Sequence, residues 1–307
     1  MPDPKLYLLA MAASAIASLL FVLAATAVVR PTSTTRRNVA SILGIGLGLA
    51  VGYNVLALRL AWPPVKGLDR LLLIIVPATI GIELIAGFPC IPRSVAWLMR
   101  TCLAVAAPRI LLRGSVYLSS PGSDRDLWLS GAELVLWSSL LIGTWRLLTL
   151  LSARSPGISI PMALAMTTQS AGLTIMMAGY IKGGAATIPL AAALVGTTVA
   201  TYLMRNRISL SGAIGIGVVG LFGILFIGRF FGRLSTACAL TLLLAPLLLW
   251  VSEMPFLKHR KPWLVGSIKV LLVAIPLMVV VTLAKQAFDR EMAPLLSIIY
   301  DVLEVGS

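Results

Sequence analysis

The stretch SGAIGIGVVGLFGILFIG, residues 211–228, has no charged side chain and contains six glycines. An apolar run of about 18 residues is long enough to cross the hydrocarbon core of a bilayer as an α-helix. Glycine weakens helices in water, but between membrane helices it lets two backbones approach closely and gain dispersion contacts. The stretch therefore predicts a membrane span whose glycines form a packing surface rather than a ligand groove. Gly44, Gly48 and Gly52, which recur every four residues, favour the same interpretation for an earlier span.

The whole chain shares this apolar character. It has 307 residues, of which 59% are hydrophobic and 12% are charged, a balance far from that of soluble globular domains. Apolar runs of about 20 residues recur along it, separated by short segments rich in Arg, Lys, Pro and Gly. The sequence therefore predicts an all-α fold, a polytopic transmembrane helical bundle with short loops.

The predicted transmembrane domain covers residues 1–292 and contains about ten spans. These are expected near residues 6–29, 39–58, 68–88, 94–112, 127–151, 160–181, 185–204, 208–228, 234–252 and 264–284. Residues 293–307 form a separate C-terminal segment, in which Leu295, Ile298, Ile299 and Val302 recur at helical spacing. Because this segment is too short to cross a bilayer, it is expected to be an interfacial amphipathic helix.

Basic residues outnumber acidic ones, with 25 Lys and Arg against 11 Asp and Glu. They are scattered over the interhelical loops and form no basic run with interleaved aromatic residues, so no nucleic-acid partner is predicted. The expected partner is a lipid bilayer with anionic lipids. The predicted location is an integral membrane, of the bacterial inner (cytoplasmic) membrane type. The clusters RPTSTTRR (30–37) and KHRK (258–261) favour a cytoplasmic position for the loops that contain them.

Metal and redox ligands are scarce in the sequence. Cys90, Cys102 and Cys238 show no CxxC spacing, and His259 is the only histidine. We therefore predict no metal site, no cofactor and no disulfide-based chemistry, and we assign no catalytic residue.

The segment MTTQSAG, residues 166–172, is unusually polar for a membrane span. At 100° per residue its threonines fall on a face of small residues, where their hydroxyls can bond to carbonyls of the same helix. Gln169 falls among the large side chains instead. Its amide costs on the order of 2 to 7 kcal/mol if it is left unpaired in lipid, so it is expected to meet a partner or to line water.

A hairpin turn at Lys182-Gly183-Gly184 would place Gln169 opposite Thr197. Thr168 and Thr198 would then lie at about the same depth in the membrane. This layer of four side chains is predicted to be either an interhelical hydrogen-bond clamp or a substrate-binding layer.

Charged residues within spans give the other candidate site. Glu83 and Arg100 lie almost symmetrically about the turn FPCIP (88–92), so antiparallel spans would bring them to the same depth. Arg109 and Glu133 similarly face the same side of the membrane. Both sets are predicted to be either neutralising ion pairs or a proton-coupled site, in which Glu83 titrates and Arg100 holds it or an anionic substrate.

These patterns favour a small secondary carrier or exporter of a small-molecule substrate. Short loops leave no room for a soluble domain, and prolines inside spans, such as Pro77 and Pro276, can form hinges. A non-catalytic subunit or scaffold with a membrane-protein partner is the alternative. An integral membrane enzyme on lipid-linked substrates is the least favoured, because Asp124 and Asp126 are the only Asp pair with metal-ligand spacing and lie in a predicted loop.

Overall fold

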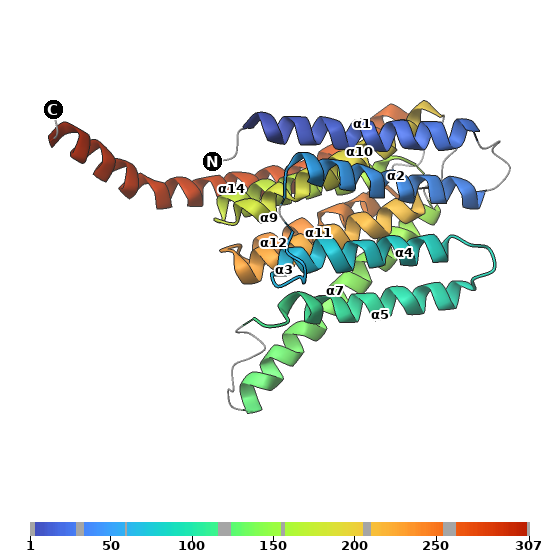
Figure 1. Cartoon of the computed structure of the whole chain (residues 1–307), viewed down its shortest axis with the longest axis horizontal. Helices are drawn as coiled ribbons and strands as arrows, with labels where there is room; N and C mark the ends of the chain where they lie inside the picture. Colours follow the sequence, from blue (N-terminus) through green and yellow to red (C-terminus); the bar gives the residue numbers. More distant parts are fainter. Residues whose placement is uncertain are drawn as a thin grey trace.

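The computed structural model describes residues 4–28, 34–58, 60–115, 124–154, 157–204, 210–253 and 262–305. These residues form helices that lie side by side with roughly aligned axes, and the described ranges contain no strand (Figure 1). The helices are α1 (Pro4–Val28), α2 (Thr34–Val55), α3 (Gly67–Arg70), η1 (Leu71–Ile75), α4 (Val76–Ala86), α5 (Arg93–Leu112), α7 (Asp124–Arg154), α8 (Ser159–Met177), α9 (Ile181–Ala185), α10 (Thr187–Leu203), α11 (Ser211–Phe231), α12 (Thr236–Leu244), η2 (Ala245–Glu253) and α14 (Pro262–Val305).

Seven of the described helices are long and apolar enough to cross a membrane, as a multi-pass membrane protein requires. They are α1, α2, α5, α7, the α9–α10 run, α11 and α14. The predicted spans near 68–88, 160–181 and 234–252 fall on helical residues that do not meet this requirement. The first is interrupted by a π-helical segment, the second contains the polar run at residues 167–170, and the third changes from an α-helix to a 3-10 helix. The all-helical fold is thus confirmed, with seven candidate membrane-spanning helices, but the count of ten spans is not.

Helix α11 is the centre of the bundle. Nearly all of its residues are buried, and it contacts α2, α4, α5, α7, α8, α10 and α12. A Cβ atom on Gly220 would overlap the side chain of Leu190, and one on Gly223 would overlap that of Leu71. The predicted packing role of the α11 glycines is therefore confirmed, because neighbouring side chains already occupy the space that larger residues would need.

The glycines of α2 form a second close contact, with α1 and α10. A Cβ on Gly48 would lie 2.9 Å from the Ser14 carbonyl oxygen and 3.0 Å from the Ala193 Cβ. The Ser14 hydroxyl lies 2.8 Å from the carbonyl oxygens of both Gly48 and Pro189, and it can donate to either. Small residues thus let three backbones meet, and a buried hydroxyl joins them.

Residues 67–86 form one helical run in which α3 passes through the π-helical η1 into α4. Pro77 lies at the start of α4, immediately after the π segment. Proline has no N–H and its ring collides with the carbonyl of the preceding turn, so a widened turn before it relieves the clash. The run therefore contains a built-in irregularity between its two ends.

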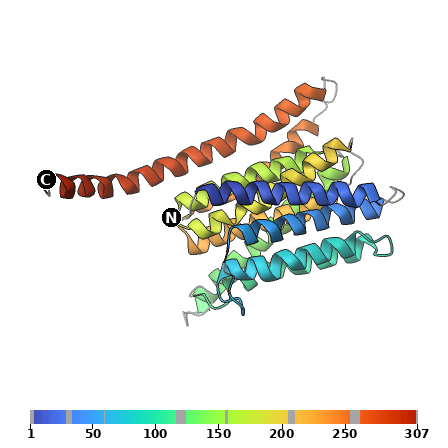
Figure 2. The same ribbon diagram turned by 45° about the horizontal axis from the view of Figure 1, so that its top comes forward.

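Helix α14 differs from the prediction of a span at 264–284 followed by a separate segment. It is one helix of 44 residues from Pro262 to Val305. At 1.5 Å per residue it is about 66 Å long, roughly twice the thickness of the hydrocarbon core. Its C-terminal part projects beyond the rest of the bundle (Figure 2). The side chains of the predicted amphipathic segment 293–307 all lie outside the described part, so its amphipathic character stays a prediction.

Candidate functional site

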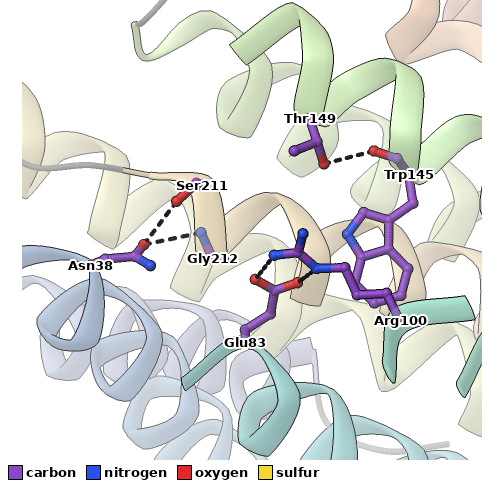
Figure 3. A network of polar contacts seen from close by, with 7 residues as sticks. All are labelled: Asn38, Glu83, Arg100, Trp145, Thr149, Ser211 and Gly212. Carbon is purple, nitrogen blue, oxygen red and sulfur yellow. Dashed lines mark hydrogen bonds and ion pairs between the residues drawn. The ribbon is translucent and has the colours of Figure 1, made fainter. Parts of the chain in front are cut away.

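Glu83 on α4 and Arg100 on α5 form a bidentate ion pair (Figure 3). Arg100 Nε donates to Glu83 Oε1 at 2.9 Å, and Arg100 Nη2 donates to Glu83 Oε2 at 2.8 Å. The exposed fraction of the side chain is 1% for Glu83 and 12% for Arg100. The structure thus brings these two predicted site residues into contact, in the geometry that gives the strongest carboxylate–guanidinium pairing.

The space around this pair is shaped by neighbouring helices. A Cβ atom on Gly215 of α11 would overlap the Glu83 carboxylate, so the glycine provides the room that the carboxylate occupies. The guanidinium carbon of Arg100 lies 5.2 Å from the ring centroid of Trp97 and 5.8 Å from that of Trp145 on α7. Aromatic faces attract a cation at this range, so the rings hold Arg100 in place.

A second polar contact lies at the same end of the bundle (Figure 3). Asn38 Oδ1 on α2 accepts hydrogen bonds from the Ser211 hydroxyl and the Gly212 N–H, both at 3.1 Å. The first N–H groups of a helix have no partner within it, and Leu210 at the N-cap position supplies no side-chain acceptor. Asn38 therefore caps α11 from a different helix, next to the turn of α11 that meets Glu83.

The other predicted ion pair, of Arg109 with Glu133, is not formed in the described structure. Arg109 on α5 and Glu133 on α7 are both exposed, and no salt bridge joins them among the residues that the structure describes. Although α5 and α7 pack together, both side chains project outward from the bundle. Equal membrane depth was a correct condition for pairing but not a sufficient one, because the two side chains must also face each other.

The predicted turn at Lys182-Gly183-Gly184 is also wrong, because these residues lie within α9. The chain turns before it, where Gly179 has a φ of +86°, a conformation that favours glycine. A Cβ on Gly172 would overlap the side chain of Thr187, so the α8–α10 hairpin is centred near residue 180. This shift separates the levels of Gln169 and Thr197 by about seven residues, or two helical turns.

The threonines of the predicted polar layer bond within their own helices. The hydroxyls of Thr168, Thr197 and Thr198 each donate to the carbonyl four residues earlier, at 2.7, 3.0 and 2.6 Å. Thr197 also meets Ser18 of α1, with 2.7 Å between the two hydroxyl oxygens. No hydrogen bond joins Gln169 to these threonines, so the polar clamp that the described residues form links α10 to α1 instead of α8.

Gln169 itself is only half-buried. Within the described ranges, no group lies in hydrogen-bonding position to its amide. It sits three and seven residues after Met166 and Met162, which line a cavity of about 230 Å³ between α8, η2 and α14. At helical spacing Gln169 extends the face that these two methionines form, so its amide is available for an incoming group.

The enzyme alternative depends on residues whose side chains the structure does not describe. In the part of the chain that the structure describes, no group of three or more His, Cys, Asp or Glu side chains is arranged to hold a metal ion. The side chains of Asp124 and Asp126 lie outside the described part, as do those of His259 and of the basic clusters at 30–37 and 258–261.

Sequence reasoning missed Asn38, Gly215, Trp145 and Ser18. Each of these residues contacts a helix that is distant in the sequence, and the local spacing of residues does not predict which helix that is. The seven long apolar helices are compatible with a multi-pass helical membrane protein, and Glu83 and Arg100 form an ion pair within it. Comparison with known proteins finds neither a family whose profile matches this chain nor a curated protein with a similar sequence.

Proposed function

We propose that the protein is a small secondary carrier or exporter in an inner-type (cytoplasmic) membrane, built from ten spans. Three helical runs besides the seven apolar helices are close to the length that a crossing needs: residues 67–86, Ser159–Met177 and residues 236–253. Each packs against neighbouring helices of the bundle, which can accommodate polar or irregular turns on the contacting side. Anionic lipid headgroups would balance the basic loops.

The observation that carries this proposal is the buried pair of Glu83 and Arg100. Removing two charges from water costs several kcal/mol per ion, and apolar residues would fill the same volume without that cost. Ionisable residues within membrane bundles mark ion and substrate pathways for this reason. Protonation of Glu83 would remove the charge that holds Arg100, which could then bind an anionic group of a substrate. The pair would thereby couple proton movement to substrate binding.

The helical run that carries Glu83 supplies a means of movement. Its π-helical segment and Pro77 form an irregular region between the ends of the run. Such breaks in transporter helices allow one part of the bundle to move against another. Because Gly215 closely contacts Glu83, a change at the ion pair would act directly on the central helix α11.

Gln169 is the residue of the predicted polar layer that we retain as a direct substrate contact. Its amide has unused hydrogen-bonding capacity in the described structure and lies beside the cavity between α8 and α14. Thr168, Thr197 and Thr198 are not retained as substrate contacts, because their hydroxyls already bond to carbonyls of their own helices.

Transport can be tested in proteoliposomes that contain a trapped pH-sensitive dye. Amino acids, amines, organic acids and hydrophobic cations would be added outside, one at a time, and internal pH followed. We expect at least one compound to cause protein-dependent proton movement that is lost in Glu83→Gln and kept in Asp289→Asn, which alters an exposed acid.

Equal activity of Glu83→Gln and the unmodified protein would disprove the coupling role of Glu83. If no compound in the panel moves protons and the protein instead co-purifies with a second membrane protein, the scaffold alternative replaces the carrier. The long α14, which projects beyond the bundle, is the part of the chain that would suit such a partner.

A further inference from the structure

A cavity of about 390 Å³ lies at the opposite end of the run 67–86 from Glu83. It is enclosed by the start of α1, the residues after α2, α3 and the turn into α9. This volume is within the range of small-molecule sites, which are mostly apolar with a few polar groups. The cavity has that composition, with leucine walls and a small set of charged and hydroxyl side chains.

Asp69 is the polar group of interest in this cavity. It lines the cavity, and its exposed fraction is 5%. Within the described ranges, no Lys or Arg nitrogen lies within 4.0 Å of its carboxylate, and no group donates a hydrogen bond to it. A buried carboxylate without a partner is costly unless a cation, a proton or water satisfies it. The Asp69 carboxylate can therefore form an ion pair with a positively charged group of a ligand.

Two tyrosines and two lysines complete the lining. Tyr7 and Tyr180 are half-buried, and their rings and hydroxyls can contact an ammonium group. Burial, and secondly the negative charge of Asp69, raise the pKa of the Tyr180 phenol, which stays a neutral donor. Lys66 and Lys182 are exposed and lie on the same lining. The cavity thus has a buried negative group and two accessible positive groups.

We propose that this cavity binds a small zwitterion, with its ammonium group on Asp69 and its anionic group near Lys66 and Lys182. A simple anion would meet the unpaired Asp69 carboxylate, and a simple cation would leave both lysines without a counter-charge. The leucine walls suit an apolar portion of the same molecule. This chemistry is shared by a free amino acid and by the phosphoethanolamine headgroup of a lipid.

Binding here is separate from the proposed transport mechanism. Asp69 and Glu83 are 14 residues apart on one helical run, which corresponds to about 21 Å along its axis. Binding can also be measured without a membrane gradient. If a zwitterion binds in this cavity but no transport is observed, only the carrier proposal is rejected. If transport is observed but no zwitterion binds in this cavity, only the zwitterion-site proposal is rejected.

The test is calorimetric titration of the purified full chain in detergent micelles that contain no ethanolamine lipids. The probes are leucine, 3-methylbutylamine, 4-methylpentanoate and glycerophosphoethanolamine. We expect millimolar or tighter binding of leucine, of glycerophosphoethanolamine or of both, and at least about tenfold weaker binding of the amine and the acid, because each lacks one charge contact. Binding of leucine alone identifies a free amino acid as the ligand, and binding of glycerophosphoethanolamine alone identifies a lipid headgroup.

Variants assign the binding to this cavity. Asp69→Asn is expected to weaken binding at least about tenfold, and Lys66→Gln with Lys182→Gln together to weaken it to a similar degree. Lys285→Gln, which removes an exposed lysine outside the lining, is the matched control and should bind normally. Three results would overturn the proposal. The first is that neither zwitterion binds at a concentration on the order of 10 mM, the limit of weak binding. The others are that the amine binds as tightly as leucine, or that Asp69→Asn binds the zwitterions normally. Tyr180→Phe, which keeps the ring, provides a second variant should Asp69→Asn fail to fold.

Discussion

Removing the charge of Arg100 should lower the free energy of unfolding more than removing the charge of Glu83, its partner in the buried ion pair. Arg100→Gln leaves the Glu83 carboxylate, whose exposed fraction is 1%, without a counter-charge. Loss of one partner of a buried pair costs about 3 to 5 kcal/mol of unfolding free energy. Glu83→Gln should cost less, about 1 to 3 kcal/mol. The reason is that Arg100 is 12% exposed, keeps its contacts with Trp97 and Trp145, and can still donate to the glutamine oxygen.

The double variant Glu83→Gln/Arg100→Gln tests whether these losses come from the pair. It leaves no unpaired buried charge, so its cost should fall short of the sum of the single costs by about 0.5 to 3 kcal/mol. Denaturant titration in mixed micelles, followed by tryptophan fluorescence, measures all three variants. Trp97 and Trp145, which flank Arg100, make this signal sensitive to the site.

Arg109→Gln is the matched control for this cycle, because Arg109 is an exposed arginine on the same helix. Its unfolding free energy should stay within about 0.5 kcal/mol of the unmodified value. Strict additivity of the two single losses, or an equal loss in Arg109→Gln, would refute the assignment of Glu83 and Arg100 as an energetically coupled pair.

Three further outcomes are expected. Gly48→Leu should abolish folding, because even a Cβ there would lie 2.9 Å from the Ser14 carbonyl oxygen. Gly143→Leu is the control and should yield folded protein by size-exclusion chromatography, because nothing lies within 4 Å of its Cβ position. Gly215→Ala should displace the Glu83 carboxylate and lower the midpoint of thermal unfolding, and an unchanged midpoint would show that the carboxylate moves freely. Gln169→Ala should change the unfolding free energy by less than about 0.5 kcal/mol but reduce transport, so a large stability loss with intact transport would assign Gln169 a structural role.

The two ends of the helical run 67–86 carry two different charged sites. One end carries the ion pair of Glu83 beside the capped start of α11, and the other carries the unpaired Asp69 beside a cavity. The π-helical segment lies between them, with Leu71 packed against Gly223 of α11. The proposed proton-coupling pair and the proposed zwitterion site are thus separate sites at the two ends of one helical run.

The sequence by itself determined the class of fold and the level that Glu83 and Arg100 share, although it misplaced the turn that sets the levels of Gln169 and Thr197. The thickness of the bilayer requires long apolar helices, so the spans could be located before their partners were known. Spacing about the turn at residues 88–92 correctly placed Glu83 and Arg100 at one level. The four-residue spacing of Gly44, Gly48 and Gly52 correctly marked a close helix contact, because few other residues allow one.

Only the tertiary structure decided which groups meet. Periodicity gives the depth and face of a side chain on its own helix, but in lipid no single apolar face is driven toward a particular neighbour. Arg109 and Glu133 therefore share a membrane side yet point away from each other, and Thr197 bonds to Ser18 of α1 rather than facing Gln169. The burial of Asp69 in a cavity depends on segments from four parts of the chain, and their assembly is a property of the packed bundle alone.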